Sequence, residues 1–297
     1  MDIENLRVFC KTYTCKSISL GAKELYLTQP TVTGKLKALE AELNLILFER
    51  NNKGVRPTAA GEVFYVYAEN IVSVYDNMRR DLDAYDGNAV KRLSISSCSI
   101  FGQYALPCSL YEYKKKVPDI EIQLEQAYSS DIILQVRDRG VDIGFIEGTY
   151  SDDVVECIVL GKTQGLFVAS PTLIKSDFLL LEDLYRYSLF MSRQESTLRR
   201  TVEAAFRQEG IEIGKLQITE LPSVESIKSS LVSGLGISVL PYMAIKKELF
   251  TKNLTPFSVE NIQVEYPYSV IYKKNTAKPC KRDFINYISD EGINYIC

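Results

Sequence analysis

The chain of 297 residues contains no histidine. This absence excludes Ser-His-Asp and Cys-His catalysis, and it argues against a typical zinc site. It also removes the side chain that usually titrates near neutral pH. No phosphate-binding glycine loop of the GxGxxG or Walker type is present. The sequence therefore points away from an enzyme, and we expect no catalytic residues, no metal and no cofactor.

Long apolar runs are also missing. The longest, such as residues 237–240, have the length of a strand, whereas a membrane-spanning helix needs about 20 apolar residues. Residues 1–4 (Met-Asp-Ile-Glu) do not start a signal peptide. We therefore expect a cytoplasmic protein without a membrane partner.

Cysteine pairs of the CxxC type are absent as well. The seven cysteines are scattered at positions 10, 15, 98, 108, 157, 280 and 297. An odd number without paired spacing fits reduced thiols in a cytosolic protein better than a disulfide framework.

An excess of positive charge is missing too, because the net charge is −3. Residues 1–65 nevertheless hold nine Lys and Arg against seven Asp and Glu, a local charge of +2. Any affinity for DNA must then come from the local placement of cations.

Residues 16–61 combine two short helical patterns with a basic hairpin. After a break at residues 27–30, a second helix is indicated by apolar residues at steps of four, three and four: Val32, Leu36, Leu39 and Leu43. Pro30 suits the first turn of this helix, where its missing N–H has no intrahelical partner. Its polar face carries Gln29, Thr31, Thr33, Lys35 and Lys37. Such a face at a helix start can enter the DNA major groove.

These residues resemble the N-terminal domain of LysR-type transcriptional regulators. The matching segments are Ala22 and Leu25, residues 28–33 (TQPTVT), Leu39-Glu40, Leu43, residues 47–50 (LFER) and residues 58–61 (TAAG). Gly34 departs from the family, which often has a larger, frequently basic residue there. Any contact from that position is lost in this chain.

The hairpin expected at residues 48–57 forms the wing of a winged helix-turn-helix, with turn residues at 51–54. Its cations can meet phosphates or enter the minor groove, although a solvated surface loop is the alternative. We predict base contacts by Gln29 and Thr33. The full predicted DNA-binding set is Thr28, Gln29, Pro30, Thr31, Thr33, Lys35, Arg50, Lys53 and Arg56.

A long helix is predicted from Thr58, as N-cap, to about Tyr85. Its apolar residues recur at steps of three and four: Tyr67, Ile71, Val74, Met78, Leu82 and Tyr85. Such a seam is typical of a helix that pairs with another helix. At about 1.5 Å per residue, the helix is too long to bury against so small a domain. We expect a dimer helix, with packing inside one chain as the alternative and a hinge at residues 86–88.

From residue 93 onward, strand patterns alternate with helix patterns in two sets, which predicts two Rossmann-like lobes. The main strands are expected at 93–96, 120–124, 142–146, 165–169, 188–191, 216–219, 237–240 and 266–272. The helices are expected at 102–116, 131–139, 197–208, 224–232 and 281–288. This part resembles the LysR effector-binding domain, which is built like periplasmic binding proteins.

The predicted fold is therefore α/β overall, in three parts. Residues 1–57 form the all-α winged helix-turn-helix with its β-wing, residues 58–89 the linker helix, and residues 90–297 the two-lobe domain. Lobe I takes in residues of about 90–161 and 267–297, and lobe II residues of about 162–266.

In a two-lobe α/β fold, ligands bind at the carboxyl ends of strands, where helix N-termini point inward. Three polar segments, at residues 96–99, 192–197 and 222–223, have this position. They suit a small polar, anionic effector, although their serines can equally be structural N-caps. The predicted effector-binding residues are Ser97, Cys98, Ser99, Glu147, Arg193, Ser196, Thr197 and Ser223.

Two of these residues have alternatives. Glu147 can accept an amino group or pair with Arg193, and with Glu225 it argues against a purely cationic site. Cys98 can be a small lining side chain, or a thiol whose pKa is lowered near a helix N-terminus and which senses oxidants.

The resemblance implies a DNA-binding transcriptional regulator rather than an enzyme. It implies double-stranded promoter DNA with an interrupted palindrome, a small-molecule effector, and a homotetramer built as a dimer of dimers through the linker helix. A redox-sensing regulator that uses Cys98 is the first alternative, and an enzyme the second. The effector, the target genes and the direction of regulation do not follow from the sequence.

Overall fold

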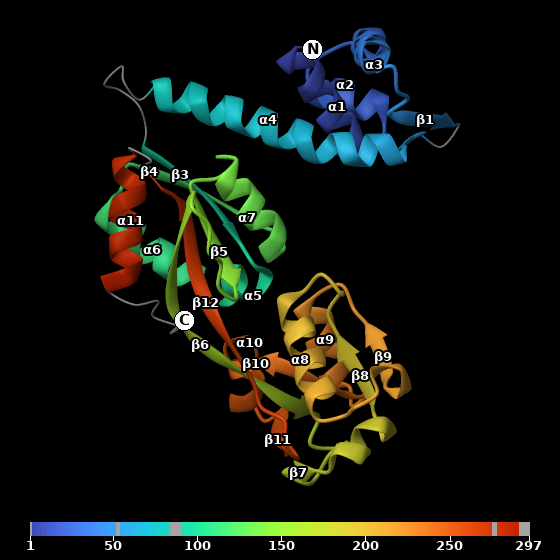
Figure 1. Ribbon diagram of the computed structural model, residues 1–297, viewed down its shortest axis with the longest axis vertical. Coiled ribbons are helices and arrows are strands. Elements are labelled where there is room, and N and C mark those ends of the chain that lie inside the picture. The colour runs from blue at the N-terminus through green and yellow to red at the C-terminus, as the bar shows by residue number, and fades with distance from the viewer. Residues whose placement is uncertain (1, 52–53, 84–90, 275–277, 291–297) are drawn as a thin grey trace. The chain divides into compact units, whose positions relative to one another are not determined.

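The computed structural model describes residues 2–51, 54–83, 91–274 and 278–290 (Figure 1). The chain divides into two compact units. One contains Met1–Ala89 with Asp138–Gly140, and the other contains Val90–Arg137 with Val141–Cys297. Tyr85 and the hinge predicted at 86–88 lie outside the described residues.

The first unit is helical with one hairpin, as predicted. Its elements are α1 (Ile3–Cys15), α2 (Ile18–Glu24), α3 (Gln29–Leu43), β1 (Phe48–Asn51), β2 (Gly54–Pro57) and α4 (Ala59–Asp83). β1 and β2 are antiparallel, with Phe48 opposite Pro57. The helix-turn-helix, the wing and the long helix are thereby confirmed.

An aromatic cluster holds α1 against the start of α4. The Phe9 ring, fully buried, packs edge-on against Phe64 with centroids 4.9 Å apart. Tyr13 stacks on Tyr65 at 3.7 Å. Burying the Phe9 side chain contributes about 1.5–3 kcal/mol, and these ring contacts attach the first two turns of α4 to α1.

The wing is attached to α3 by one carboxylate. Glu40 in α3 accepts the backbone N–H groups of Leu47 and Phe48, at 2.9 and 3.2 Å. Thr58 then caps α4 by accepting the Gly61 N–H at 3.0 Å. A Cβ atom at Gly61 would collide with the Leu47 carbonyl. This close approach explains why the TAAG segment ends in glycine.

The apolar seam of α4 is only partly covered. Tyr67, Ile71, Met78 and Leu82 are exposed by 65, 44, 46 and 58 %. A single chain therefore leaves the predicted pairing face of this helix open to a partner.

The second unit is an α/β domain. Its strands are β3 (Lys91–Ser97), β4 (Ile120–Gln126), β5 (Ile143–Glu147), β6 (Val155–Ala169), β7 (Phe178–Leu179), β8 (Ser188–Met191), β9 (Gln217–Glu220), β10 (Ile237–Pro241), β11 (Thr255–Val259) and β12 (Val264–Lys273). Its helices are α5 (Ser99–Tyr104), α6 (Leu106–Lys116), α7 (Ser129–Arg137), η2 (Leu181–Arg186), α8 (Thr197–Gln208), η3 (Ile213–Lys215), α9 (Val224–Val232), α10 (Tyr242–Phe250) and α11 (Pro279–Asp290).

Two long strands join the lobes of this unit. The sheet order is β4-β3-β5-β12-β6-β10-β8-β9. β6 and β12 are antiparallel neighbours over most of their length and run from one group of parallel strands to the other (Figure 1). The stretches of β6 and β12 that cross between the lobes therefore form one surface that belongs to both lobes. We call this surface the shared floor.

Several elements differ from the sequence prediction, and β7, η2, η3 and β11 were not among the expected elements. The helix expected at 102–116 is two helices, α5 and α6, because Pro107 has no N–H to donate to the preceding turn. The strand expected at 165–169 is only the end of the 15-residue β6. α10, at residues 242–250, was not predicted.

The thiols also differ in part from expectation. Cys10, Cys15, Cys98, Cys157 and Cys280 are free, but Cys108 is disulfide-bonded. The prediction of reduced thiols is therefore wrong for Cys108.

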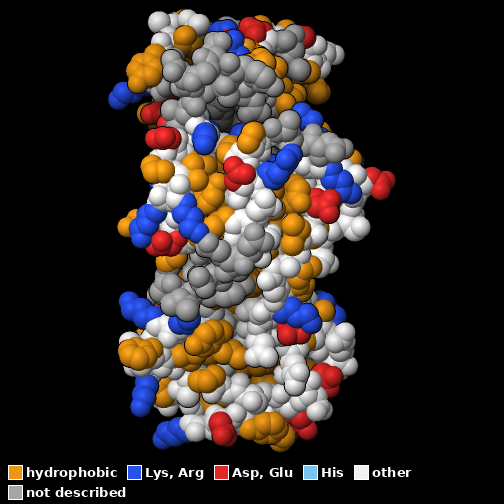
Figure 2. Space-filling model, turned by 90° about the vertical axis from the view of Figure 1, so that its left-hand side faces the viewer, with side chains coloured by type: hydrophobic (Ala, Val, Ile, Leu, Met, Phe, Trp, Pro, Cys, Tyr) orange, Lys and Arg blue, Asp and Glu red, His pale blue; other side chains and the backbone are white. Residues whose placement is uncertain are grey.

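The described residues contain no helix with the length and apolar character needed to cross a membrane. Within the same residues, no group of acidic or cysteine side chains could hold a metal ion. Figure 2 shows Lys and Arg side chains interspersed with Asp and Glu over one face. The coloured atoms of this view form no large area of one sign, as the near-neutral net charge leads one to expect.

Candidate DNA-binding and effector sites

The start of α3 presents an exposed polar edge. Thr28 is the N-cap and accepts the Thr31 N–H at 3.4 Å, and the two hydroxyls lie 2.8 Å apart. Gln29 and Pro30 form the first turn and are exposed. Thr28 and Thr31 are thus engaged in capping the helix. Gln29 is the residue of this turn whose long polar side chain does not cap the helix backbone.

Gln29 is held by the preceding helix. The Ser19 hydroxyl of α2 donates to the Gln29 side-chain oxygen at 3.2 Å. An amide fixed by one hydrogen bond loses less rotamer freedom when it binds a base edge. Ser19 thus contacts the Gln29 side chain, a pairing that was not predicted from the sequence.

Thr33 and Lys35, which were also predicted to bind DNA, are less exposed than Gln29. Thr33 is half-buried, and the Lys35 ammonium donates to the Asn5 side chain of α1 at 3.4 Å. Gly34 is exposed, and a Cβ atom there would meet nothing within 4 Å. The first side-chain atom of a larger residue would therefore meet no neighbour at position 34.

The wing offers one described cation. Arg56 in β2 is exposed and lies opposite Glu49 in the hairpin register. Lys53 and the side chain of Arg50 lie outside the described part of the chain.

The candidate effector site lies on one face of the sheet where the lobes join. In the register, Glu147 of β5 is opposite Tyr268 of β12, and Tyr266 is opposite Thr163 of β6. Residues opposite each other, and residues two apart on one strand, point to the same face. Glu147, Tyr268, Tyr266 and Thr163 therefore share this face.

Glu147 has an unusual environment for a carboxylate. It is buried, and desolvation raises its pKa from 4.5 to about 7. The backbone N–H of Leu198, near the start of α8, and the charge of Arg200 favour the ionised form but only in part. A carboxyl group from lobe I thus lies at a helix start of lobe II.

The predicted polar residues of α8 lie at the same place. Thr197 contacts lobe I, since its hydroxyl is 3.5 Å from that of Ser129 in α7, and it accepts a hydrogen bond from Arg200 at 3.2 Å. Ser129 also accepts the backbone N–H of Glu147 at 3.2 Å. Ser196 precedes α8 as N-cap without a side-chain cap bond.

Cys98 is the N-cap of the short helix α5. Its backbone N–H donates to the Phe145 carbonyl at 2.9 Å. Burial raises the pKa of its thiol well above the usual value, and the charge of Glu147 adds to this. Ser97 is buried and donates to the Cys98 carbonyl at 3.1 Å, while Ser99 is exposed. The thiol is therefore held in its protonated, less reactive form.

Ser223 caps α9 and is engaged there. Its hydroxyl accepts the Ser226 N–H at 3.2 Å, and Ser226 returns a hydrogen bond to the Ser223 carbonyl. This is the structural alternative considered for that serine.

A second contact between the lobes joins α5 to α9. The Tyr104 hydroxyl of α5 donates to the Glu225 carboxylate of α9. Lys228, which is buried, pairs at 3.0 Å with both Glu225 and Glu248 of α10. Its ammonium also lies 5.3 Å from the centre of the Tyr104 ring. α10 thus takes part in the lobe junction.

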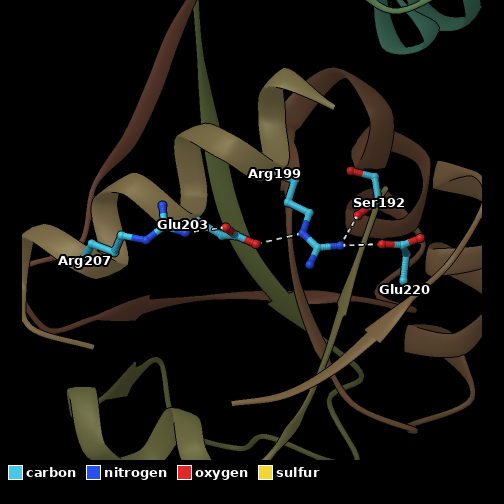
Figure 3. A network of polar contacts seen from close by, with 5 residues as sticks. All are labelled: Ser192, Arg199, Glu203, Arg207 and Glu220. Carbon is cyan, nitrogen blue, oxygen red and sulfur yellow. Dashed lines mark hydrogen bonds and ion pairs between the residues drawn. The ribbon is translucent and has the colours of Figure 1, made fainter. Parts of the chain in front are cut away.

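The arginines in and before α8 differ in their partners: Arg199 and Arg207 form ion pairs, whereas Arg193 is exposed. Figure 3 shows Arg199 donating to Glu203 and Glu220 at 2.8 Å, and to the Ser192 carbonyl at 2.9 Å. Arg207 donates to the other oxygen of Glu203 at 2.8 Å. Arg193 is exposed, and no ion pair between it and Glu147 occurs among the described residues.

Thr163, Tyr266 and Tyr268 were not among the residues predicted for this site. Tyr266, Tyr268, Val270 and Tyr272 alternate along one strand, and this period of two indicates a single face. The position of that face at the lobe junction becomes visible only with the partner strands.

Comparison with known proteins agrees with this architecture. Residues 3–62 match the model of the bacterial regulatory helix-turn-helix protein, lysR family, and residues 86–292 match the LysR substrate binding domain. A probable RuBisCO transcriptional regulator of Cyanidium caldarium is 26 % identical over 91 % of this chain and 87 % of its own length. A protein of the same name from Porphyra purpurea is 28 % identical over 93 and 89 %.

Solved structures show the same fold. CbnR, a LysR family transcriptional regulator, superposes with a TM-score of 0.71 at 18 % identity, covering 98 % of this chain and 99 % of CbnR. The regulatory domain of Synechocystis PCC6803 CcmR, in complex with 2-PG, superposes with a TM-score of 0.61 at 19 % identity, covering 69 and 98 %.

The winged helix-turn-helix and the two-lobe α/β domain thus match the two family models in order, over nearly the whole length. The chain belongs to the LysR family of DNA-binding transcriptional regulators.

Proposed function

We propose that the chain regulates transcription in the cytoplasm by binding promoter DNA in a sequence-specific way, under the control of a small polar effector. The observation that carries the proposal is the exposed start of α3, with Gln29 held by Ser19. Side chains at this end of a recognition helix reach base edges in the major groove.

The open face of α4 supports an oligomer. Its exposed apolar residues recur at steps that suit a helix pair. We propose a dimer through this helix and a tetramer of two such dimers on an interrupted palindrome.

The junction of the lobes supports effector control. Glu147 and the start of α8 bring groups from both lobes together, so a molecule bound there would change the free energy of lobe closure. The sequence-predicted anionic charge of the effector would need a cation at this place. Arg193 is exposed and Arg199 is tied to two carboxylates, so we propose only that the effector is small and polar.

We make no proposal about the target genes. The named relatives are 26–28 % identical, and we take from them the family and not the genes. A redox-sensing role for Cys98 has less support, because burial keeps the thiol protonated. The α/β lobes alone do not indicate catalysis, and we propose no enzymatic activity.

In vitro selection from random double-stranded DNA by the full chain tests the proposal. We expect enrichment of an interrupted palindrome, and loss of that enrichment in Gln29→Ala. Recovery of unenriched DNA by the folded wild-type chain would contradict sequence-specific binding.

A further inference from the structure

The Glu147 carboxylate is the one acidic side chain among the described residues that is buried on the shared floor of the lobes. We propose that the effector carries an ammonium or amidinium group that pairs with Glu147, with the Tyr266 hydroxyl beside it as a second polar contact. This inference rests on the proposed function, and it names the chemical class of the effector.

Tyr266 supplies an independent observation. Its side chain is 3 % exposed, and its hydroxyl forms no regular hydrogen bond among the described residues, although the Tyr268 hydroxyl lies near enough to interact with it. It lies within electrostatic range of both Glu147 and Cys98. A buried hydroxyl without a regular hydrogen bond is unfavourable, so a ligand group that reached Tyr266 would gain a hydrogen bond there.

The other groups on the floor are mostly acceptors or neutral. Tyr268 is opposite Glu147, and Thr163 is opposite Tyr266. The Tyr268 hydroxyl contacts the Met243 sulfur of α10 at 3.7 Å. Among these four side chains, only Glu147 can carry a charge at neutral pH, and that charge is negative.

The two buried cations near this site are engaged away from Glu147. Arg199 pairs with Glu203 and Glu220 (Figure 3), and Lys228 pairs with Glu225 and Glu248. Arg200 is exposed, and its positive charge favours the ionised form of Glu147. A ligand cation would complete the charge compensation that Arg200 and the Leu198 N–H provide only in part.

An anionic ligand would be repelled by the ionised Glu147 carboxylate. The start of α8 would attract it, but the N–H of Leu198 already faces the Glu147 carboxylate. An anion would therefore need Glu147 to be protonated or displaced, whereas a cation would bind the ionised form.

The pH dependence separates these cases. The groups that face Glu147 are Cys98 from α5, Tyr266 and Tyr268 from β12, and Arg200 with the Leu198 N–H from α8. Burial raises the pKa of Cys98 and of both tyrosines, so they stay neutral between pH 6 and 8. Affinity for a cation should rise over this interval as Glu147 ionises, and affinity for an anion should fall.

The test measures thermal stabilisation of the full chain by two sets of compounds of similar size. One set contains amino sugars, amino-acid amides and diamines, and the other contains dicarboxylates, phosphorylated acids and 2-PG. We expect an amine to stabilise the wild type, and its affinity by calorimetry to rise between pH 6 and 8. Glu147→Gln should lower that affinity at least tenfold.

Glu195→Gln is the matched control, because Glu195 is exposed just before α8. It removes the same charge and should leave the amine affinity unchanged. Glu147→Asp keeps the charge and should retain part of the binding, which shows that a loss in Glu147→Gln is not a folding defect.

Stabilisation by anions alone, by no compound of either set, or by amines equally in Glu147→Gln would overturn this assignment. DNA selection by the wild-type chain is independent of the effector. If selection succeeds while the amine set fails, only the effector class is wrong, and if selection fails the proposed function itself is wrong.

Discussion

The Ser19 hydroxyl donates a hydrogen bond to the side-chain oxygen of Gln29, 3.2 Å away and ten residues later in the chain. A residue of α2 thereby orients the first polar residue of α3. If Gln29 contacts a base, Ser19 contributes to specificity without touching that base.

Ser19→Ala should therefore relax sequence preference at the base pair that Gln29 contacts. We expect a loss of about 0.5–1.5 kcal/mol on the selected site, the usual net value of one hydrogen bond. Ser19→Thr keeps the hydroxyl and should behave like the wild type. A loss in Ser19→Ala that persists in the Gln29→Ala background would show that Ser19 acts in some other way.

Arg56 on the wing should act through phosphates. Its exposed position predicts that Arg56→Ala weakens binding to every sequence alike and lowers the slope of log affinity against log salt by about one unit. Fluorescence anisotropy over a salt series measures this slope. An unchanged slope with a lost base preference would assign Arg56 to base contact instead.

Ile71 lies in the middle of the exposed seam of α4 and is 44 % exposed in the single chain. Ile71→Asp should produce monomers or smaller species, because a charge buried in an apolar interface is costly without a partner. Light scattering after size-exclusion chromatography gives the mass, and Ile71→Leu is the conservative control. An unchanged mass for Ile71→Asp would place the interface elsewhere.

Glu147 should make stability depend on pH. Its pKa rises from 4.5 to about 7 on folding, so between these values the folded chain keeps a proton that the unfolded chain has lost. Stability should therefore fall as pH rises from about 4.5 to 7, and stay lower above that.

Glu147→Gln removes this loss, and its advantage over the wild type should grow by roughly 3 kcal/mol between pH 4 and pH 8. Urea unfolding of the second unit at both pH values measures the difference, with Glu195→Gln as control. A pH-independent difference between Glu147→Gln and the wild type would show that the pKa of Glu147 is not raised.

The first unit was predictable because its signals are local. The helix break at residues 27–30, the N-cap at Thr58 and the turn residues of the wing each act over a few positions. α3 begins at Gln29, so Pro30 lies in its first turn as predicted. Ser19 escaped notice because its role depends on how α2 lies against α3.

The effector site was less predictable, because it depends on strand partners far apart in the sequence. Glu147 and the start of α8 were identified as ends of elements, but Tyr266 and Thr163 meet them only through the register of β12 with β6. Arg193 was expected to be the cation of the site from its position before α8. In the structure, the buried cation of that region is Arg199, and it faces Glu203 and Glu220 (Figure 3).

The central claim is that the start of α3 recognises DNA sequence. The most direct measurement compares the affinity of Gln29→Ala and the wild type for a selected site and for random DNA at one salt concentration. The account predicts a loss of about 1–3 kcal/mol on the selected site and almost none on random DNA. Equal losses on both would contradict it.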